Sequence, residues 1–192
     1  YRNGTAFTDT YSSYEATGLT EEKYNTLKKK MLKSIYKNGG FYVGRYETGI
    51  AYNDINGTRF ESGDTIQTPI IRQNAYPYTC VSAMQAQNLS SGFAEEGYTS
   101  SLMFGVQWDL VLKYLETTGV ATQSELKTNA NYWGNFTIAT WSITNTNAKY
   151  NLKDTEEWLP APYTKTSTSA VVATTTGATA YFAKQGIFDL AG

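Results

Sequence analysis

Apolar side chains recur at helical spacing most clearly in residues 20–40 of this chain. Four of them fall on one stripe: Tyr24, Leu27, Met31 and Ile35. Thr20 is placed to cap a helix whose first turn is acidic and whose second half is rich in lysine, in agreement with the helix macrodipole. The run Asn38-Gly39-Gly40 supplies a stop signal, so we predict a helix from Thr20 to this run.

The lysines of this predicted helix admit two interpretations. They are Lys28, Lys29, Lys30 and Lys33. A solvated face is the ordinary interpretation of such a cluster, and a phosphate or polyanion site is the alternative.

Two further helices are predicted downstream. Ser82 can open a helix that runs to about Leu89, with Ala83, Met84, Ala86 and Leu89 facing inward. A second helix is expected from about Val106 to Thr117, with Trp108, Val111, Leu112 and Leu115 as its apolar stripe and Gly119 after its end. Residues 124–127 can add one more helical turn.

Extended segments are predicted where apolar and polar residues alternate. Residues 41–47 alternate in this way and predict a strand. The short segment Ser169-Ala170-Val171-Val172-Ala173 is a second candidate strand, although it does not alternate. Asn56-Gly57 is a strong hairpin signal. Residues 186–192 suggest a short buried strand that leads into a tight turn, in which Asp189 caps or ties the turn. We expect this strand to pair with sequence after Gly192.

Composition narrows the classes of function. The 192 residues contain no histidine and one cysteine, so a serine–histidine triad, a histidine-ligated metal and an internal disulfide are excluded within them. The net charge of −1 and the absence of a long apolar run give no sign of a nucleic-acid partner or of direct membrane insertion. We expect no cofactor and no metal. The chain is rich in tyrosine, which suits an extracellular recognition surface.

Candidate chemistry is sparse. An aromatic, amide-rich stretch supplies the candidate ligand-binding residues: Tyr132, Trp133, Asn135 and Trp141. On a surface these side chains would stack against a sugar or a peptide, and folded inward they would be core; the pattern leaves both open. Cys80 precedes a helix and reads as a small buried hydrophobe rather than a reactive thiol. The acidic residues around Asn56 match no calcium-loop spacing.

Four segments, in order, resemble the formylglycine-generating-enzyme (sulfatase-modifying factor) family. Residues 41–47, Phe-Tyr-Val-Gly-Arg-Tyr-Glu, resemble its F-Y-[ILM]-G-[KR]-[YF]-E segment. Residues 78–86 are similar to its helix start P-V-x-x-V-S-W-x-x-A, and residues 102–109 to R-L-P-T-E-A-E-W-E. Residues 186–192, Gly-Ile-Phe-Asp-Leu-Ala-Gly, resemble G-L-Y-D-M-A-G, which the family continues with N-V-W-E-W.

The resemblance implies an α+β, C-type-lectin-like fold. Two main helices would pack against small twisted antiparallel sheets, with much irregular backbone. Residues 1–192 would form a single domain that lacks its C-terminal part and an upstream region.

The resemblance also guides the functional hypothesis. The family's enzymes use a copper-binding cysteine pair, and this segment holds none. Non-catalytic bacterial and phage relatives are display domains, some of them variable proteins of diversity-generating retroelements. We therefore expect a non-enzymatic binding domain on a cell surface or phage tail, with a protein or glycan receptor as partner and with oligomerisation left open. The alternatives are an oxidase with cysteines beyond Gly192 and a structural module of a surface appendage.

Overall fold

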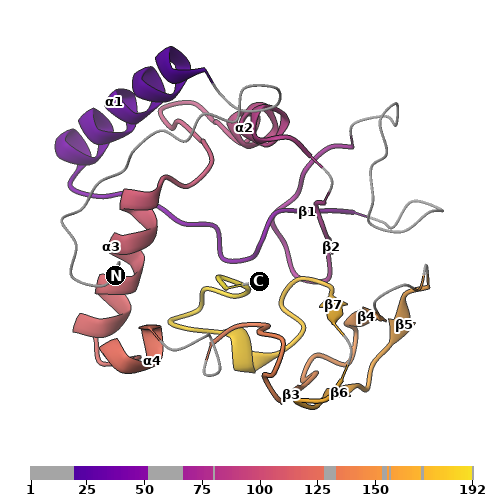
Figure 1. Cartoon of the computed structure of the whole chain (residues 1–192). Helices are drawn as coiled ribbons and strands as arrows, with labels where there is room; N and C mark the ends of the chain where they lie inside the picture. The colour runs from indigo at the N-terminus through magenta and orange to yellow at the C-terminus, as the bar shows by residue number, and fades with distance from the viewer. Residues whose placement is uncertain are drawn as a thin grey trace. The chain divides into compact units, whose positions relative to one another are not determined.

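A computed structural model describes residues 20–51, 67–79, 81–127, 133–152, 155, 157–169 and 171–191. In this part of the chain it has four α-helices and three small antiparallel sheets, so the α+β class is confirmed at this level (Figure 1). The chain divides into two compact units, residues 1–43 with 81–111 and residues 44–80 with 112–192. The prediction of a single domain stays a prediction.

Unit 1 is helical. Its elements are α1 (Glu21–Asn38), α2 (Ala83–Ser91) and the first part of α3 (Gly105–Thr117), a helix that ends in unit 2. The predicted caps of α1 are confirmed: the Thr20 side chain accepts a hydrogen bond from the Lys23 backbone, and Gly39 takes a positive φ of 77° at the C-terminus. Met31 is buried, and Tyr24 of α1 packs against Phe104 with ring centroids 5.8 Å apart.

Helix α2 begins as predicted but buries a different face. The Ser82 side chain and the Gln85 side chain form a reciprocal capping box. The buried residues of α2 are Gln87 and Ser90, whereas Ala83 is exposed, so the predicted inward set was wrong at that position. The side-chain oxygen Oε1 of Gln87 accepts a hydrogen bond from the Leu102 backbone N–H 3.2 Å away, which satisfies this polar group inside the unit.

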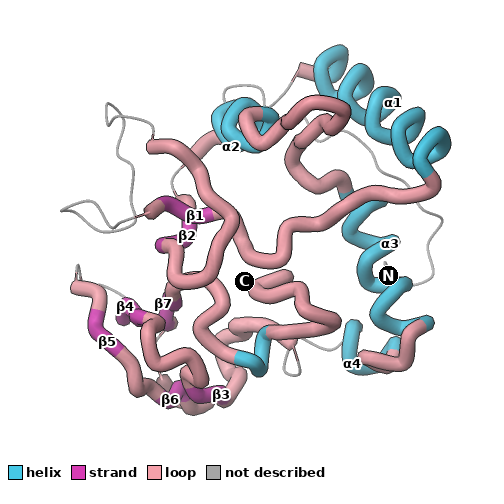
Figure 2. Tube along the Cα trace, turned by 180° about the vertical axis from the view of Figure 1, so that it is seen from behind, coloured by secondary structure: helices cyan, strands magenta, loops and turns pink. Residues whose placement is uncertain are grey.

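Unit 2 contains the strands and one short helix, α4 (Gln123–Lys127). The strands form three sheets: β1 (Gly49–Ile50) with β2 (Tyr76–Pro77); β3 (Trp141–Ser142) with β6 (Thr164–Lys165); and β5 (Leu159–Pro160), β4 (Lys149–Leu152) and β7 (Val172–Thr174) in that order. All pairs are antiparallel. Figure 2 shows how short these strands are and how much of the unit is loop.

The core of unit 2 is aromatic. Ala139, Trp141, Val172 and Phe182 are buried together, and partly buried aromatic residues surround them. On α3, Leu112 and Leu115 of unit 2 and Val111 of unit 1 are also buried, as the apolar stripe predicted, whereas Trp108 is only partly buried.

Two predicted strands differ in the structure. Residues 41–47 form no strand, although their polarity alternates. Residues 186–191 are mostly turn, with Ile187 in a single bridge to Lys184. The predicted strand at 169–173 appears as β7, displaced toward the C-terminus. The predicted hairpin at Asn56-Gly57 and Cys80 lie outside the described residues.

Candidate functional site

The predicted ligand-binding tryptophans lie in the interior of unit 2. Trp133 is 5% exposed and Trp141 is 3% exposed. The Asn135 side-chain amide donates a hydrogen bond to the Val172 carbonyl at 2.7 Å, and this contact attaches the segment to β7. Tyr132 lies outside the described residues. The burial favours the core alternative for the two indole rings, since a ligand cannot stack on a covered ring.

Trp141 illustrates why the sequence could not decide whether these indole rings are on the surface or in the core. Its ring makes edge contacts with Tyr163 at 6.1 Å and with Phe182 at 5.2 Å between centroids. Both partners are more than twenty residues away in sequence, so no local pattern around Trp141 reveals them. Tyr163 in turn stacks on Tyr150 at 4.2 Å, which extends the cluster toward β4.

A buried lysine supports the turn that precedes β3. Lys165 is 1% exposed, and its ammonium group donates to the carbonyl oxygens of Phe136, Thr137 and Ala139 at 3.4, 2.5 and 3.0 Å. Burial lowers the pKa of Lys165 from its ordinary value. Three donors are matched by three acceptors, so this lysine has a structural role that the sequence did not indicate.

A buried threonine-rich turn, residues 174–179, connects distant parts of unit 2. The Thr176 hydroxyl donates to the Arg72 carbonyl at 2.7 Å and accepts from the Ala75 backbone at 3.0 Å. The Gly177 carbonyl accepts from the side chains of Gln73 and Asn145 at 3.1 and 3.3 Å. After β7 ends at Thr174, these side-chain hydrogen bonds act together with backbone hydrogen bonds, such as the one between Thr176 and Asn74, to hold irregular backbone in place.

Asp189 fastens the chain near residue 190 to this turn. Its carboxylate accepts a hydrogen bond from the Gly177 backbone at 2.7 Å, so Asp189 ties a turn, but the turn is the one at residues 174–179 and not the predicted one at 186–192. The residue takes a positive φ of 55°. Beside it, the Phe188 backbone donates to the Arg45 carbonyl at 2.8 Å, and the Phe188 ring stacks on Tyr46 at 5.1 Å. Burial raises the pKa of Asp189, and the hydrogen bond from Gly177 opposes that rise.

The carboxyl group of Glu47 has a strongly raised pKa. Desolvation, followed by the negative charge of Asp189, raises the pKa of Glu47 from 4.5 to about 7. The Glu47 side chain nevertheless remains open to solvent. It is thus a carboxyl group set among many protein atoms but reachable by water. Such a group can exchange a proton near neutral pH, although one carboxyl pair does not define a reaction.

The described residues contain no cluster of three or more metal-ligating side chains. The expectation of no metal remains a prediction. None of the described helices has the length and apolar character to cross a membrane.

Among the described residues, Tyr42 and Tyr98 of unit 1 form a ring pair that is largely exposed to solvent. Tyr42 is 89% exposed and Tyr98 is 63% exposed, and their rings meet edge to face at 6.2 Å between centroids. The turn that presents Tyr98 contains Gly97 at φ 83° and a backbone hydrogen bond from Tyr98 to Glu95. The alternation of residues 41–47 placed Tyr42 on the opposite side from Phe41, but nothing in the sequence indicated its contact with Tyr98.

Comparisons of this chain with known protein families, with curated proteins and with solved structures gave no match.

Proposed function

We propose that this chain is a non-enzymatic display domain with a C-type-lectin-like fold, which binds a protein or glycan receptor outside the cell. The resemblance of its four ordered motifs to the formylglycine-generating-enzyme family supports the proposal. The mixture of helices, small antiparallel sheets and long loops is consistent with that fold. A bacterial surface or a phage tail is the setting that the resemblance suggests.

The observation that carries the proposal is the exposed pair Tyr42 and Tyr98. Tyrosine combines a rigid apolar ring with a hydroxyl group, so it gives much contact area for little loss of side-chain entropy. Two such rings packed on each other at 6.2 Å with 89% and 63% of their surface exposed form a prearranged contact surface. An edge-to-face pair leaves ring faces available to stack on a sugar or an apolar side chain.

The hydrogen-bonded turn of unit 2 gives further support. A display domain has to hold irregular backbone in one conformation, and residues 174–179 are held through the buried side chain of Thr176, the partly buried side chain of Asn145 and Asp189. Rigid support of loops reduces the entropy lost on binding.

The test is binding of the fluorescently labelled chain to a panel of intact bacteria, measured by flow cytometry. We expect saturable binding to at least one strain, displaced by excess unlabelled chain. Treatment of the cells with protease or with periodate then distinguishes a protein receptor from a glycan.

The double variant Tyr42→Ala/Tyr98→Ala should weaken this binding at least tenfold, because truncation of a central aromatic contact costs about 2 kcal/mol or more. Tyr114→Ala is the matched control, since Tyr114 is 51% exposed on α3 and belongs to no ring pair among the described residues. Equal affinities of the double variant and the wild-type chain would contradict the proposed surface. Self-association without cell binding would favour the structural module, and formylglycine formation on a cysteine peptide would favour the oxidase.

A further inference from the structure

The outward face of α1 concentrates positive charge in a chain that is slightly acidic overall. Helix α1 contains six lysines and two glutamates, which give it a formal charge of +4. The whole chain carries −1, so all residues outside α1 together carry −5. Five lysines of the helix are exposed, and the four nearest its C-terminus form what we call the α1 basic face: Lys29, Lys30, Lys33 and Lys37.

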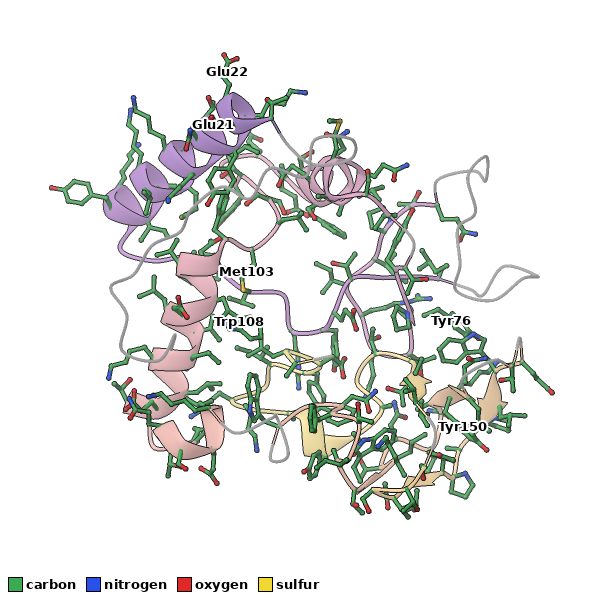
Figure 3. The ribbon with its side chains drawn as sticks, in the orientation of Figure 1. Glu21, Glu22, Tyr76, Met103, Trp108 and Tyr150 are labelled. Atoms are coloured by element: carbon green, nitrogen blue, oxygen red, sulfur yellow. The ribbon has the colours of Figure 1, made fainter. Side chains whose placement is uncertain are left out.

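The spacing of these lysines makes a line along the helix. Lys29, Lys33 and Lys37 are four residues apart, so each is about 6 Å further along the axis than the last and the row is about 12 Å long. Glu21 and Glu22 lie at the N-terminal end of the helix (Figure 3). They are separated from Lys29 by about two turns, or roughly 10 Å.

The lysines are not neutralised within the described part of the chain. None of the four forms an ion pair there, and the one described salt bridge joins Lys113 to Glu116 on α3. Lys28 is different, since it is partly buried with its ammonium group 5.8 Å from the centroid of the Tyr24 ring. The basic face is therefore open to an external anion.

A second row, of apolar character, runs beside the lysines. Leu32 is 44% exposed and Tyr36 is 92% exposed, and they lie one turn apart on the outward side of α1. The inward side of the helix already packs through Tyr24 and the buried Met31. The exposed apolar pair is thus additional to the stripe that holds the helix in unit 1.

We propose that the α1 basic face binds a flexible anionic polysaccharide. Carboxylate or sulfate groups spaced along the polymer would contact the row of lysines, and the apolar faces of the sugar rings would stack on Tyr36 and Leu32. The proposal rests on the proposed function only in taking the ligand from a cell surface. It concerns a surface other than the pair Tyr42 and Tyr98.

The charge distribution favours a polysaccharide over a duplex nucleic acid or an anionic membrane. Both of those are extended, stiff anionic surfaces that would face a large part of the chain, and the residues outside α1 carry −5. A flexible, narrow polymer can contact the 12 Å row alone. The row is also made of lysine, whereas bidentate recognition of phosphate and of bases uses arginine.

The experiment measures the affinity of the chain for polygalacturonate and for dextran sulfate by biolayer interferometry, with neutral dextran as the uncharged control. The variant Lys29→Gln/Lys33→Gln/Lys37→Gln should weaken binding to at least one of the two anionic polymers on the order of tenfold, because each contact releases a counterion from the polymer. Affinity of the wild-type chain should fall as salt is raised from 50 to 300 mM.

The matched control removes the same charge elsewhere. Lys113→Gln/Lys127→Gln/Lys149→Gln deletes three exposed lysines outside α1 and should change the affinity less than twofold. Tyr36→Ser should weaken binding about threefold, whereas Tyr114→Ser should not. All substituted side chains are exposed, so each variant should keep the fold, which circular dichroism checks.

Equal losses of affinity in the α1 variant and the control variant would overturn the proposal, and so would no binding to either anionic polymer. Tighter binding to a 20-base-pair DNA duplex or to phosphatidylglycerol vesicles than to the polymers would also overturn it. The same experiments distinguish failure of this proposal from failure of the proposed function. Cell binding that persists without polysaccharide binding removes only this inference, and polysaccharide binding without cell binding removes only the receptor-binding proposal.

Discussion

Replacement of Glu47 by glutamine should stabilise the protein at pH 8 and not at pH 4. Glutamine keeps the size of the side chain but cannot ionise. Because desolvation and the charge of Asp189 raise the pKa of Glu47 to about 7, the folded state favours the protonated form. The pKa of Glu47 in the unfolded chain is 4.5. Its contribution to stability is therefore fully present below pH 4.5 and is lost as the pH rises through 7.

The size of the expected stabilisation follows from the pKa shift of Glu47. A rise in pKa from 4.5 to about 7 corresponds to an upper limit of about 3 to 4 kcal/mol at 1.36 kcal/mol per pH unit. The Glu47 side chain keeps access to solvent, so screening reduces this value, and we expect about 1 kcal/mol of stabilisation at pH 8. For a chain of this length that equals a rise in Tm of roughly 2–4 °C.

The assay is thermal unfolding followed by circular dichroism at half-unit steps between pH 4 and pH 8.5. Glu157→Gln is the control, because Glu157 is an exposed carboxyl group in the same unit. Asp189→Asn keeps an oxygen that can accept from Gly177 but removes the neighbouring charge, so the pKa of Glu47 should fall, which NMR titration measures. A difference between Glu47→Gln and wild type that stays constant across the pH range would refute the reasoning.

Two further substitutions test the packing of unit 2. Gly177→Ala should lower stability by about 2 kcal/mol or more in urea unfolding, because Gly177 has a φ of 65° and a Cβ there would lie 2.6 Å from the Tyr46 ring. Gly97→Ala, at φ 83° in open space, should cost only about 1 kcal/mol; equal losses would contradict the steric argument. Lys165→Met should lower stability by about 2 kcal/mol, because three carbonyl groups lose their donor. Lys149→Met, at an exposed position, should change the Tm by less than 2 °C, and a similar change in both lysine variants would contradict the structural role of Lys165.

The helices could be predicted because their signals are local. Thr20, the stripe through Met31 and Gly39 all lie within twenty residues, and the structure places each as expected. The capping box at Ser82 is local in the same way. Cap, stripe and stop signal together specify a helix without reference to the rest of the chain.

The strands and the candidate site could not be predicted in the same way, because each depends on a distant partner. Residues 41–47 alternate in polarity, yet a strand also needs a neighbouring strand, and Arg45 instead accepts one hydrogen bond from Phe188. The burial of Trp141 depends on Tyr163 and Phe182.

The central claim is that the chain binds a receptor without changing it chemically. The most direct test measures binding and the mass of the receptor in one sample. Labelled chain is titrated onto a strain that binds it, and the receptor is recovered by crosslinking and examined by mass spectrometry. Our account predicts saturable, reversible binding, loss of that binding in Tyr42→Ala/Tyr98→Ala, and a receptor of unchanged mass. Chemical conversion of the receptor by the chain, or binding that never saturates, would contradict a non-enzymatic display domain.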